Sequence, residues 1–247
     1  MKKFVTPLML AMSLAAAGSA FAQAAPAEPE STMSFNVGAV NEYRYRGISQ
    51  SRLDPALQGG ADYADKSGAY VGVWGSSIKW VKDAGGKSNA EVDYYGGYKF
   101  TVGEVAYDLG FLHYEYSGNG LAVSTNTNEL YGAVTMGPTT LKYSQSTGNL
   151  FGFANSKGSS YVDLTANFDL GEGYSFAPHL GYQSVKGAGN SIYSYTDAAL
   201  TLGKDLGNGL SASAAVIGTN AKTGSYVSPA GKQLGKAGLV VGIKYTF

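Results

Sequence analysis

Apolar and polar side chains alternate with a period of two along most of the chain, and the last ten residues (GLVVGIKYTF) show this pattern most clearly. The apolar side of the segment consists of Leu239, Val241, Ile243, Tyr245 and Phe247. Because successive side chains of a β-strand point to opposite faces, we expect a strand with one apolar face and one face of mostly small or polar residues. A strand of about ten residues can cross an outer membrane when it is tilted in a barrel.

The same alternation predicts twelve strands in all. They are expected at residues 35–45, 57–63, 68–80, 92–100, 105–116, 130–136, 141–143, 162–170, 176–183, 198–202, 210–219 and 238–247. The pattern does not assign the inward face of the strand at 68–80. The phase of the alternation blurs at residues 112–116, where a β-bulge would account for it.

The connections between the predicted strands alternate in length. Links after the even-numbered strands are short, whereas those after the odd-numbered strands are mostly longer and polar. The longer links span residues 47–53, 81–89, 117–126, 148–158, 187–192 and 220–235. Outer-membrane barrels have this arrangement, with tight periplasmic turns and larger extracellular loops. A soluble β-sandwich, the alternative fold, has no reason to sort its connections by length.

An even number of strands brings both ends of a barrel to the same side of the membrane. The strand at 35–45 is therefore expected to pair with the last strand and close the sheet, with Phe247 at the periplasmic rim. We predict an all-β fold: a transmembrane antiparallel β-barrel of about twelve strands connected as an up-and-down meander.

The first residues have the features of a secretory signal peptide. Lys2 and Lys3 precede a largely apolar run over residues 4–17, and residues 20–22 (AFA) supply the small residues that a signal peptidase requires. A transmembrane helix is the alternative, but a run of about 14 residues is short for one. We expect a signal peptide at 1–22, a flexible periplasmic leader at 23–33 and the barrel at 34–247.

Composition narrows the possible chemistry. The chain has 35 glycines and no cysteine, which disfavours long helices and excludes disulfides and thiol chemistry. Basic and acidic side chains number 18 each, and loss of Lys2 and Lys3 leaves a small acidic excess. The sequence has no basic patch of the kind that would indicate nucleic acid as a partner. Neither a His-x-x-x-His pattern nor a calcium-loop spacing occurs, so no metal or cofactor is expected.

Many aromatic residues fall near the predicted strand ends, where rings with a polar tip suit the headgroup level of a membrane. They are Tyr43, Tyr45, Tyr94, Tyr98, Phe100, Tyr114, Tyr116, Tyr143, Tyr161, Tyr174, Tyr182, Tyr245 and Phe247. The general preference of aromatic residues for strands explains some of these positions.

Four segments carry a resemblance to a known family: NEYRYRGISQS (41–51), PALQGGADYAD (55–65), GAYVGVWGSS (68–77) and EVDYYGGY (91–98). Together they resemble the TorF family, whose members are proposed to be porins of Gram-negative bacteria. The likeness is densest over residues 34–100 and returns in the final strand. It implies an outer-membrane barrel with a channel role and no catalytic residues. In such barrels the C-terminal strand is also the label that the barrel-insertion machinery reads.

Charged residues on the polar faces of the strands are candidates for lining a pore. They are Glu42, Arg44, Arg46, Asp62, Glu91, Asp93, Lys99 and Asp163. In a membrane barrel these charges should point inward, because Arg or Lys facing lipid at mid-bilayer costs about 2–4 kcal/mol. They would form either a charged constriction for small hydrophilic solutes or an ion-pair network that stiffens a narrow barrel. Mixed signs predict weak ion selectivity.

Two other functions remain open at this stage. A barrel lipase or protease would need a nucleophile beside a base, and His113 and His179 are the histidines of the chain, neither in a local catalytic motif. A plugged structural or receptor-like barrel would bind partners through its loops, although these have few aromatic anchors. The function that we predict is a narrow outer-membrane channel, in contact with membrane lipid, for passive diffusion of small hydrophilic solutes.

Overall fold

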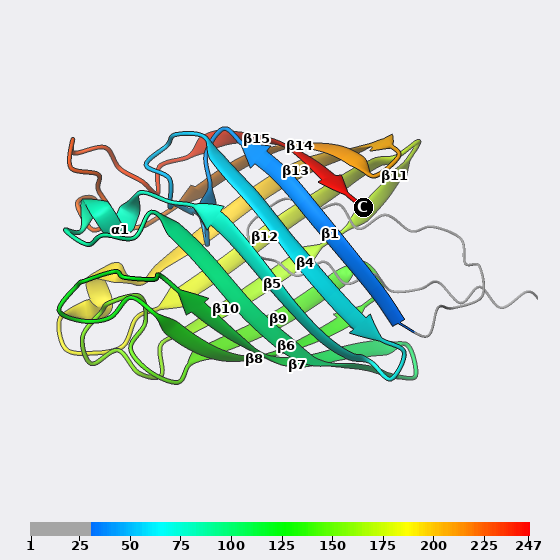
Figure 1. Ribbon diagram of the computed structural model, residues 1–247, viewed down its shortest axis with the longest axis horizontal. Helices are drawn as coiled ribbons and strands as arrows, with labels where there is room; N and C mark the ends of the chain where they lie inside the picture. Colours follow the sequence, from blue (N-terminus) through cyan, green and yellow to red (C-terminus); the bar gives the residue numbers. More distant parts are fainter. Residues whose placement is uncertain (1–30) are drawn as a thin grey trace, which may run out of the picture.

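Twelve antiparallel strands close into a tilted barrel in the computed structural model, which describes residues 31–247 (Figure 1). The strands of the wall are β1 (Ser31–Val40), β4 (Ala56–Asp65), β5 (Ala69–Ser77), β6 (Ala90–Val102), β7 (Val105–Glu115), β8 (Thr127–Met136), β9 (Thr139–Ser146), β10 (Ser160–Ala166), β11 (Phe168–Gly171), β12 (Tyr174–Ser184), β13 (Tyr195–Gly207), β14 (Leu210–Thr219) and β15 (Gly238–Thr246). Neighbours in sequence are neighbours in the sheet, so the predicted all-β meander is confirmed.

β10 and β11 are two segments of one wall strand. Between them, the backbone N–H of Asn167 donates to the carbonyl of Pro138 at 2.8 Å, at the turn before β9. β10 pairs with β9 on one side and β12 on the other, whereas β11 pairs only with β12. The pairing of β10 with β12 leaves the sheet without free edges over most of its height, which satisfies the backbone polar groups.

The first and last strands pair as predicted. Asn36 lies opposite Thr246, and the register continues to Val40 opposite Gly242. The pairing extends by one residue, because Phe35 and Phe247 exchange backbone hydrogen bonds of 2.8 and 2.9 Å. Their rings also stack, with centroids 5.8 Å apart. Phe247 therefore lies at the end of the barrel that carries the short turns (Figure 1).

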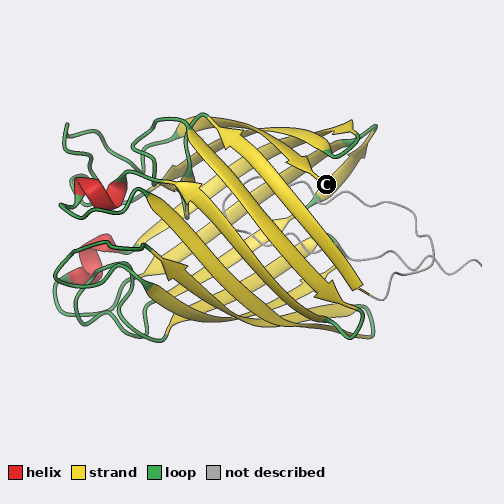
Figure 2. Cartoon of the chain, viewed as in Figure 1, coloured by secondary structure: helices red, strands yellow, loops and turns green. Residues whose placement is uncertain are grey.

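The connections are sorted by length between the two ends of the barrel (Figure 2). Tight turns at one end leave two or three residues between strands, and several depend on glycine at positive φ, such as Gly68 and Gly209. The opposite end carries six long connections, at residues 41–55, 78–89, 116–126, 147–159, 185–194 and 220–237. Two of them contain the short helices α1 (Trp80–Asp83) and η1 (Asn190–Tyr193). Within residues 31–247, no helix has the length and hydropathy to span a membrane.

The outward face of the wall is a continuous apolar surface. Leu57 is 72% exposed, and Val71, Leu109 and Leu239 are each more than half exposed. Polar and charged side chains on the alternate positions point into the barrel, and most are buried or half-buried. The predicted alternation is thus correct for most strands, and it gives the strand at 68–80 an inward face that includes Tyr70 and Trp74.

Three local predictions are wrong. β7 contains no bulge: its register with β6 runs unbroken from Val105 to Glu115, and the phase blurs because apolar Leu112 and Tyr114 face inward. Five of the expected membrane-belt tyrosines are inside the barrel or in its loops, namely Tyr43, Tyr45, Tyr114, Tyr116 and Tyr161. β1 begins at Ser31, so residues 31–33 belong to the wall rather than to the leader. The predicted signal peptide and the rest of the leader lie outside the described residues.

Candidate functional site in the lumen

The first long connection folds into the barrel as a small hairpin. Its strands are β2 (Arg44–Tyr45) and β3 (Ile48–Ser49), and Gly47 turns between them at a φ of 79°. Asn41 ends the wall pairing just before the hairpin, because its side-chain amide donates to Leu239 O at 3.0 Å and accepts from Val241 N at 2.8 Å. The side chain thus replaces backbone partners and lets the chain leave the wall.

Tyr43 anchors the hairpin to one side of the barrel. Its ring is 1% exposed and packs edge-on against Trp74 of β5, with centroids 5.4 Å apart. Its hydroxyl donates to Glu91 Oε1 of β6 at 2.5 Å, and Tyr116 donates to the other oxygen of Glu91 at 2.6 Å. Glu91 is 1% exposed and depends on these two hydroxyls as hydrogen-bond donors.

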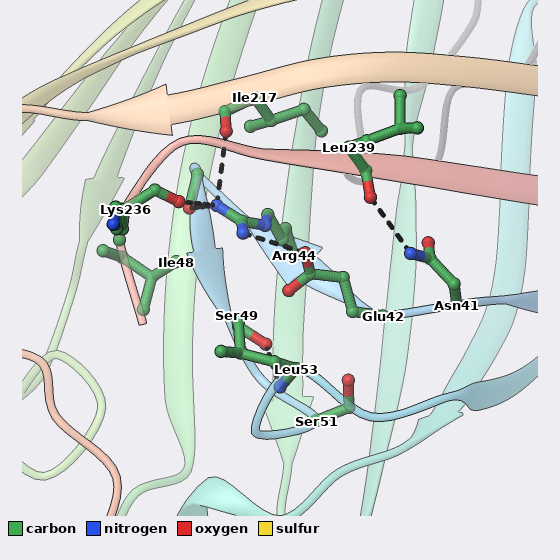
Figure 3. Close-up of polar contacts among 12 residues, drawn as sticks. Asn41, Glu42, Arg44, Ile48, Ser49, Ser51, Leu53, Ile217, Lys236 and Leu239 are labelled. Carbon is green, nitrogen blue, oxygen red and sulfur yellow. Dashed lines mark hydrogen bonds and ion pairs between the residues drawn. The ribbon is translucent and has the colours of Figure 1, made fainter. Parts of the chain in front are cut away.

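Arg44 anchors the hairpin to a second part of the wall (Figure 3). Its guanidinium donates to the carbonyl of Lys236 at 2.7 Å and to that of Ile217 in β14 at 3.3 Å. It also pairs with Glu42 Oε1 at 2.8 Å. Both side chains are buried, so the ion pair is shielded from water. The backbone carbonyls accept hydrogen bonds from the guanidinium and so stabilise part of its charge.

Arg46 extends the hairpin to a third part of the wall. Nη2 lies 2.7 Å from Glu129 Oε2 of β8, and Nη1 donates to Gln183 Oε1 of β12 at 2.7 Å. The guanidinium also lies over the rings of Tyr161 and Tyr45, with centroid distances of 4.3 and 4.7 Å. Contacts from three hairpin residues thus reach strands all around the barrel, and the hairpin crosses the lumen near the end with the long loops.

The prediction that Glu42 and Arg44 lie on the polar face of the first wall strand, with Arg46 at its end, is therefore wrong. β1 ends at Val40, and these three residues belong to the inward-folded connection. Charged and tyrosine side chains alternate from Glu42 to Arg46 with the period of a strand. Both the charged side chains and the tyrosines nevertheless lie inside the barrel. Period alone does not distinguish a strand in the wall from a strand in the lumen.

The remaining candidates lie on the inward faces of wall strands. Asp62 accepts from Tyr95 Oη at 2.5 Å, and Lys99 lies 4.4 Å from the ring centroid of Tyr70. Asp163 accepts from Thr165 at 2.8 Å. Their role as pore-lining residues stays a prediction.

Glu91, Asp93 and Glu129 form a buried acidic cluster beneath the hairpin. Asp93 is fully buried, and neither of its carboxylate oxygens has a hydrogen-bond partner among the described residues. Glu129 was not among the sequence candidates, although it alternates with the outward Leu130 and the same period would have assigned it to the lumen. Among residues 31–247, no group of histidine and acidic side chains has the arrangement of a metal site.

The two histidines occupy opposite faces of the wall. His113 is on the outer face of β7 and stacks on the exposed Tyr94, while its ring nitrogens contact Asn128 and Glu115. His179 faces inward from β12, with Nε2 2.8 Å from Asp197 and Nδ1 3.4 Å from Asp163. The hydroxyls of Thr165 and Tyr161 also lie 3.1 Å from Nδ1 and Nε2. Both nitrogens of His179 are therefore engaged by neighbouring side chains, with a carboxylate beside each.

Comparison with known protein families assigns this chain to one of them. The family model described as "Bacterial protein of unknown function (Gcw_chp)" matches residues 23–247. The chain belongs to the Gcw_chp family. The TorF family name suggested by the sequence motifs is not confirmed by this match. No curated protein matches the chain.

Solved structures with the same fold as this Gcw_chp chain include porins. A KdgM porin superposes with a TM-score of 0.55 at 10% identity, over 87% of this chain and 99% of that one. A second KdgM structure, in complex with disordered oligogalacturonate, gives the same score and identity over 88% and 99%. The NanC porin gives 0.56 at 10% identity over 87% and 99%. At this identity the likeness shows a common barrel fold.

Proposed function

We propose that the protein is an outer-membrane channel through which small hydrophilic solutes diffuse passively, and that the inward-folded hairpin is its constriction. The observation that carries the proposal is the two-sided wall: the outside is apolar and exposed, while acids and bases line the inside. Only a closed barrel can expose an apolar face to lipid while every wall strand satisfies its backbone hydrogen bonds. The signal-peptide pattern and the porin fold support the same location, the cell outer membrane.

The hairpin sets the size of the path. It ties Tyr43, Arg44 and Arg46 to separate parts of the wall, so solute must pass between the hairpin and the wall or displace the hairpin. Acids and bases are interspersed around it, as in Glu42 beside Arg44 and Glu129 beside Arg46. This mixture supports weak ion selectivity, because neither sign dominates the contacts along the path.

Solute flux into liposomes tests the proposal. Purified protein is reconstituted into vesicles, and swelling is followed in uncharged solutes of increasing size. We expect swelling with the smallest solutes and a sharp loss as size increases. Empty vesicles, and vesicles with heat-unfolded protein, serve as controls. Swelling no faster than in empty vesicles for every solute would contradict a channel role.

A closed structural or receptor-like barrel is the second candidate. The close packing of the hairpin favours it, since Glu42, Tyr43, Arg44 and Arg46 are all at most 7% exposed. The two candidates differ in whether solute passes the hairpin as it stands. They therefore predict different conductance in the unaltered protein: small current steps for the channel, and none for the closed barrel. An enzymatic barrel has less support, because His113 is on the outer face and both nitrogens of His179 are engaged.

A further inference from the structure

A cavity of about 350 Å³ lies above the hairpin, among the long loops. All six long connections contribute to its wall. Its aromatic lining includes Tyr45, Trp80, Tyr116, Phe151, Tyr195 and Tyr226. The volume is at the lower end of the range of about 300–1,000 Å³ for small-molecule sites, which are likewise mainly apolar with a few polar groups.

The aromatic rings hold one another in place. Trp80 packs edge-on against Tyr116 with centroids 5.1 Å apart, and Phe151 packs in the same way against Tyr45 at 5.7 Å. Tyr195 and Tyr226 form a third such pair at 5.4 Å. Pairs of this geometry are stabilising, so the wall is arranged before a ligand arrives and little ordering is needed on binding.

Among residues 31–247, the cavity has no unpaired charge in its lining, which disfavours ionic ligands. Arg46 and Asp83 are the charged residues that line it within the described part of the chain. Arg46 is paired with Glu129, and Asp83 is paired with Arg52. A charged ligand would lose its hydration and find no free charge of the opposite sign, which is costly in an apolar site.

One polar group in the lining is without a partner. The indole N–H of Trp80 is buried and has no hydrogen-bond acceptor among residues 31–247. Indole nitrogen only donates, and a buried donor that remains unpaired destabilises the state in which it is buried. The nitrogen is covered by its neighbours, so a ligand acceptor reaches it only after a small shift of the Trp80 side chain, and that contact would remove the penalty.

We propose that this cavity is a binding site for a neutral saccharide of one or two rings. The C–H face of a sugar ring packs on aromatic side chains, its hydroxyl oxygens accept from an indole N–H, and it carries no charge. Trp80 is the residue expected to contact the ligand with its ring, and with its N–H once the side chain shifts. The site is defined by binding and does not depend on whether the barrel conducts.

The protein contains two tryptophans, so each can be isolated as a fluorescent reporter. Trp80 lines the cavity, whereas Trp74 packs beneath the hairpin against Tyr43. With excitation selective for tryptophan, only Trp80 emits in Trp74→Phe and only Trp74 emits in Trp80→Phe. Each variant, folded in detergent and checked by its heat-dependent gel mobility, is titrated with maltose. Galacturonate dimer and benzyl alcohol are the charged and the purely aromatic comparison ligands.

We expect maltose to change Trp80 emission saturably in Trp74→Phe and to leave Trp74 emission unchanged in Trp80→Phe. The charged dimer should bind at least about tenfold more weakly. No saturable change with maltose would overturn the proposal, as would equal binding of the charged dimer. Saturation by benzyl alcohol alone would overturn the saccharide class. If Trp74→Phe does not fold, calorimetry of the unaltered protein against Trp80→Phe applies the same criteria.

Discussion

Arg46 Nη2 lies 2.7 Å from Glu129 Oε2, and this ion pair joins the inward-folded hairpin to β8 with side-chain exposures of 6% and 1%. The two residues are 83 positions apart in sequence. A buried pair of this kind contributes little net stability relative to an apolar pair, but removal of one partner leaves a buried charge uncompensated. The pair therefore specifies where the hairpin lies in the lumen.

Substitution of Arg46 should destabilise the protein more than substitution of both partners. Arg46→Ala leaves Glu129 buried and unpaired, and we expect a loss of about 3–5 kcal/mol in the free energy of unfolding. Arg46→Ala with Glu129→Gln should lose clearly less, because no charge remains buried. Urea unfolding in lipid vesicles, followed by tryptophan emission, gives the four corners of this double-mutant cycle. A double variant that loses as much stability as the sum of the two single variants would show that the pair is not coupled.

Turn glycines offer a test of the wall geometry. Gly207 and Gly209 flank the turn between β13 and β14, with φ of 84° and 81°. A Cβ at Gly209 would collide with the carbonyl oxygen of Thr246, whereas a Cβ at Gly207 would meet no heavy atom within 4 Å. Gly207→Ala should cost about 1–2 kcal/mol for the left-handed backbone alone. Gly209→Ala should cost more, because β15 must also shift.

The same unfolding assay compares the two glycine variants. If they lose equal stability, β15 is not held as closely against this turn as the register of β14 with β15 requires.

The wall could be predicted from the sequence, whereas the hairpin could not. Alternation identifies a strand wherever its two faces have different surroundings, as in the run from Leu239 to Tyr245, whose apolar residues face outward. The segment with Tyr43 and Tyr45 shows the same alternation, but the side chains on both of its faces lie inside the barrel. The contacts of Arg46 with Glu129 and Gln183 form only when the whole sheet closes. No local sequence pattern predicts them.

Deletion of Phe247 should reduce the amount of protein in the outer membrane. The deletion removes two backbone hydrogen bonds with Phe35 and a ring stacked between Phe35 and Tyr245. It also removes the terminal aromatic residue that we expect the insertion machinery to recognise. Phe247→Tyr keeps the ring and the backbone and is the matched control. Immunoblots of outer-membrane fractions measure the level, and a normal level of the truncated protein would contradict this role of Phe247.

Acid should loosen the contact between the first two long loops. Lys79 Nζ donates to Asp54 Oδ2 at 2.6 Å, and this hydrogen bond holds the pKa of Asp54 below its usual value. A carboxyl group whose pKa is lowered on folding stabilises the fold above its unfolded pKa of about 3.9, and that contribution is lost as pH falls through the folded pKa. Both side chains are largely exposed, so the effect is local and small.

Hydrogen exchange of the α1 segment, corrected for the intrinsic effect of pH, measures this loosening. Protection in the unaltered protein should fall between about pH 5 and about pH 2, whereas Lys79→Met should show lower protection with a flatter profile. Identical profiles for the two proteins would mean that the pair does not hold the loops together.

Conductance before and after removal of the hairpin tests the central claim most directly. Residues 42–50 are replaced by a short glycine–serine linker, and single-channel currents are recorded in planar bilayers beside those of the unaltered protein. A variant shortened within residues 117–124 controls for loop truncation as such. We predict small, discrete current steps in the unaltered protein and in the control, and larger steps when the hairpin is absent. Equal steps with and without the hairpin, or no current from the unaltered protein, would contradict a channel constricted by this hairpin.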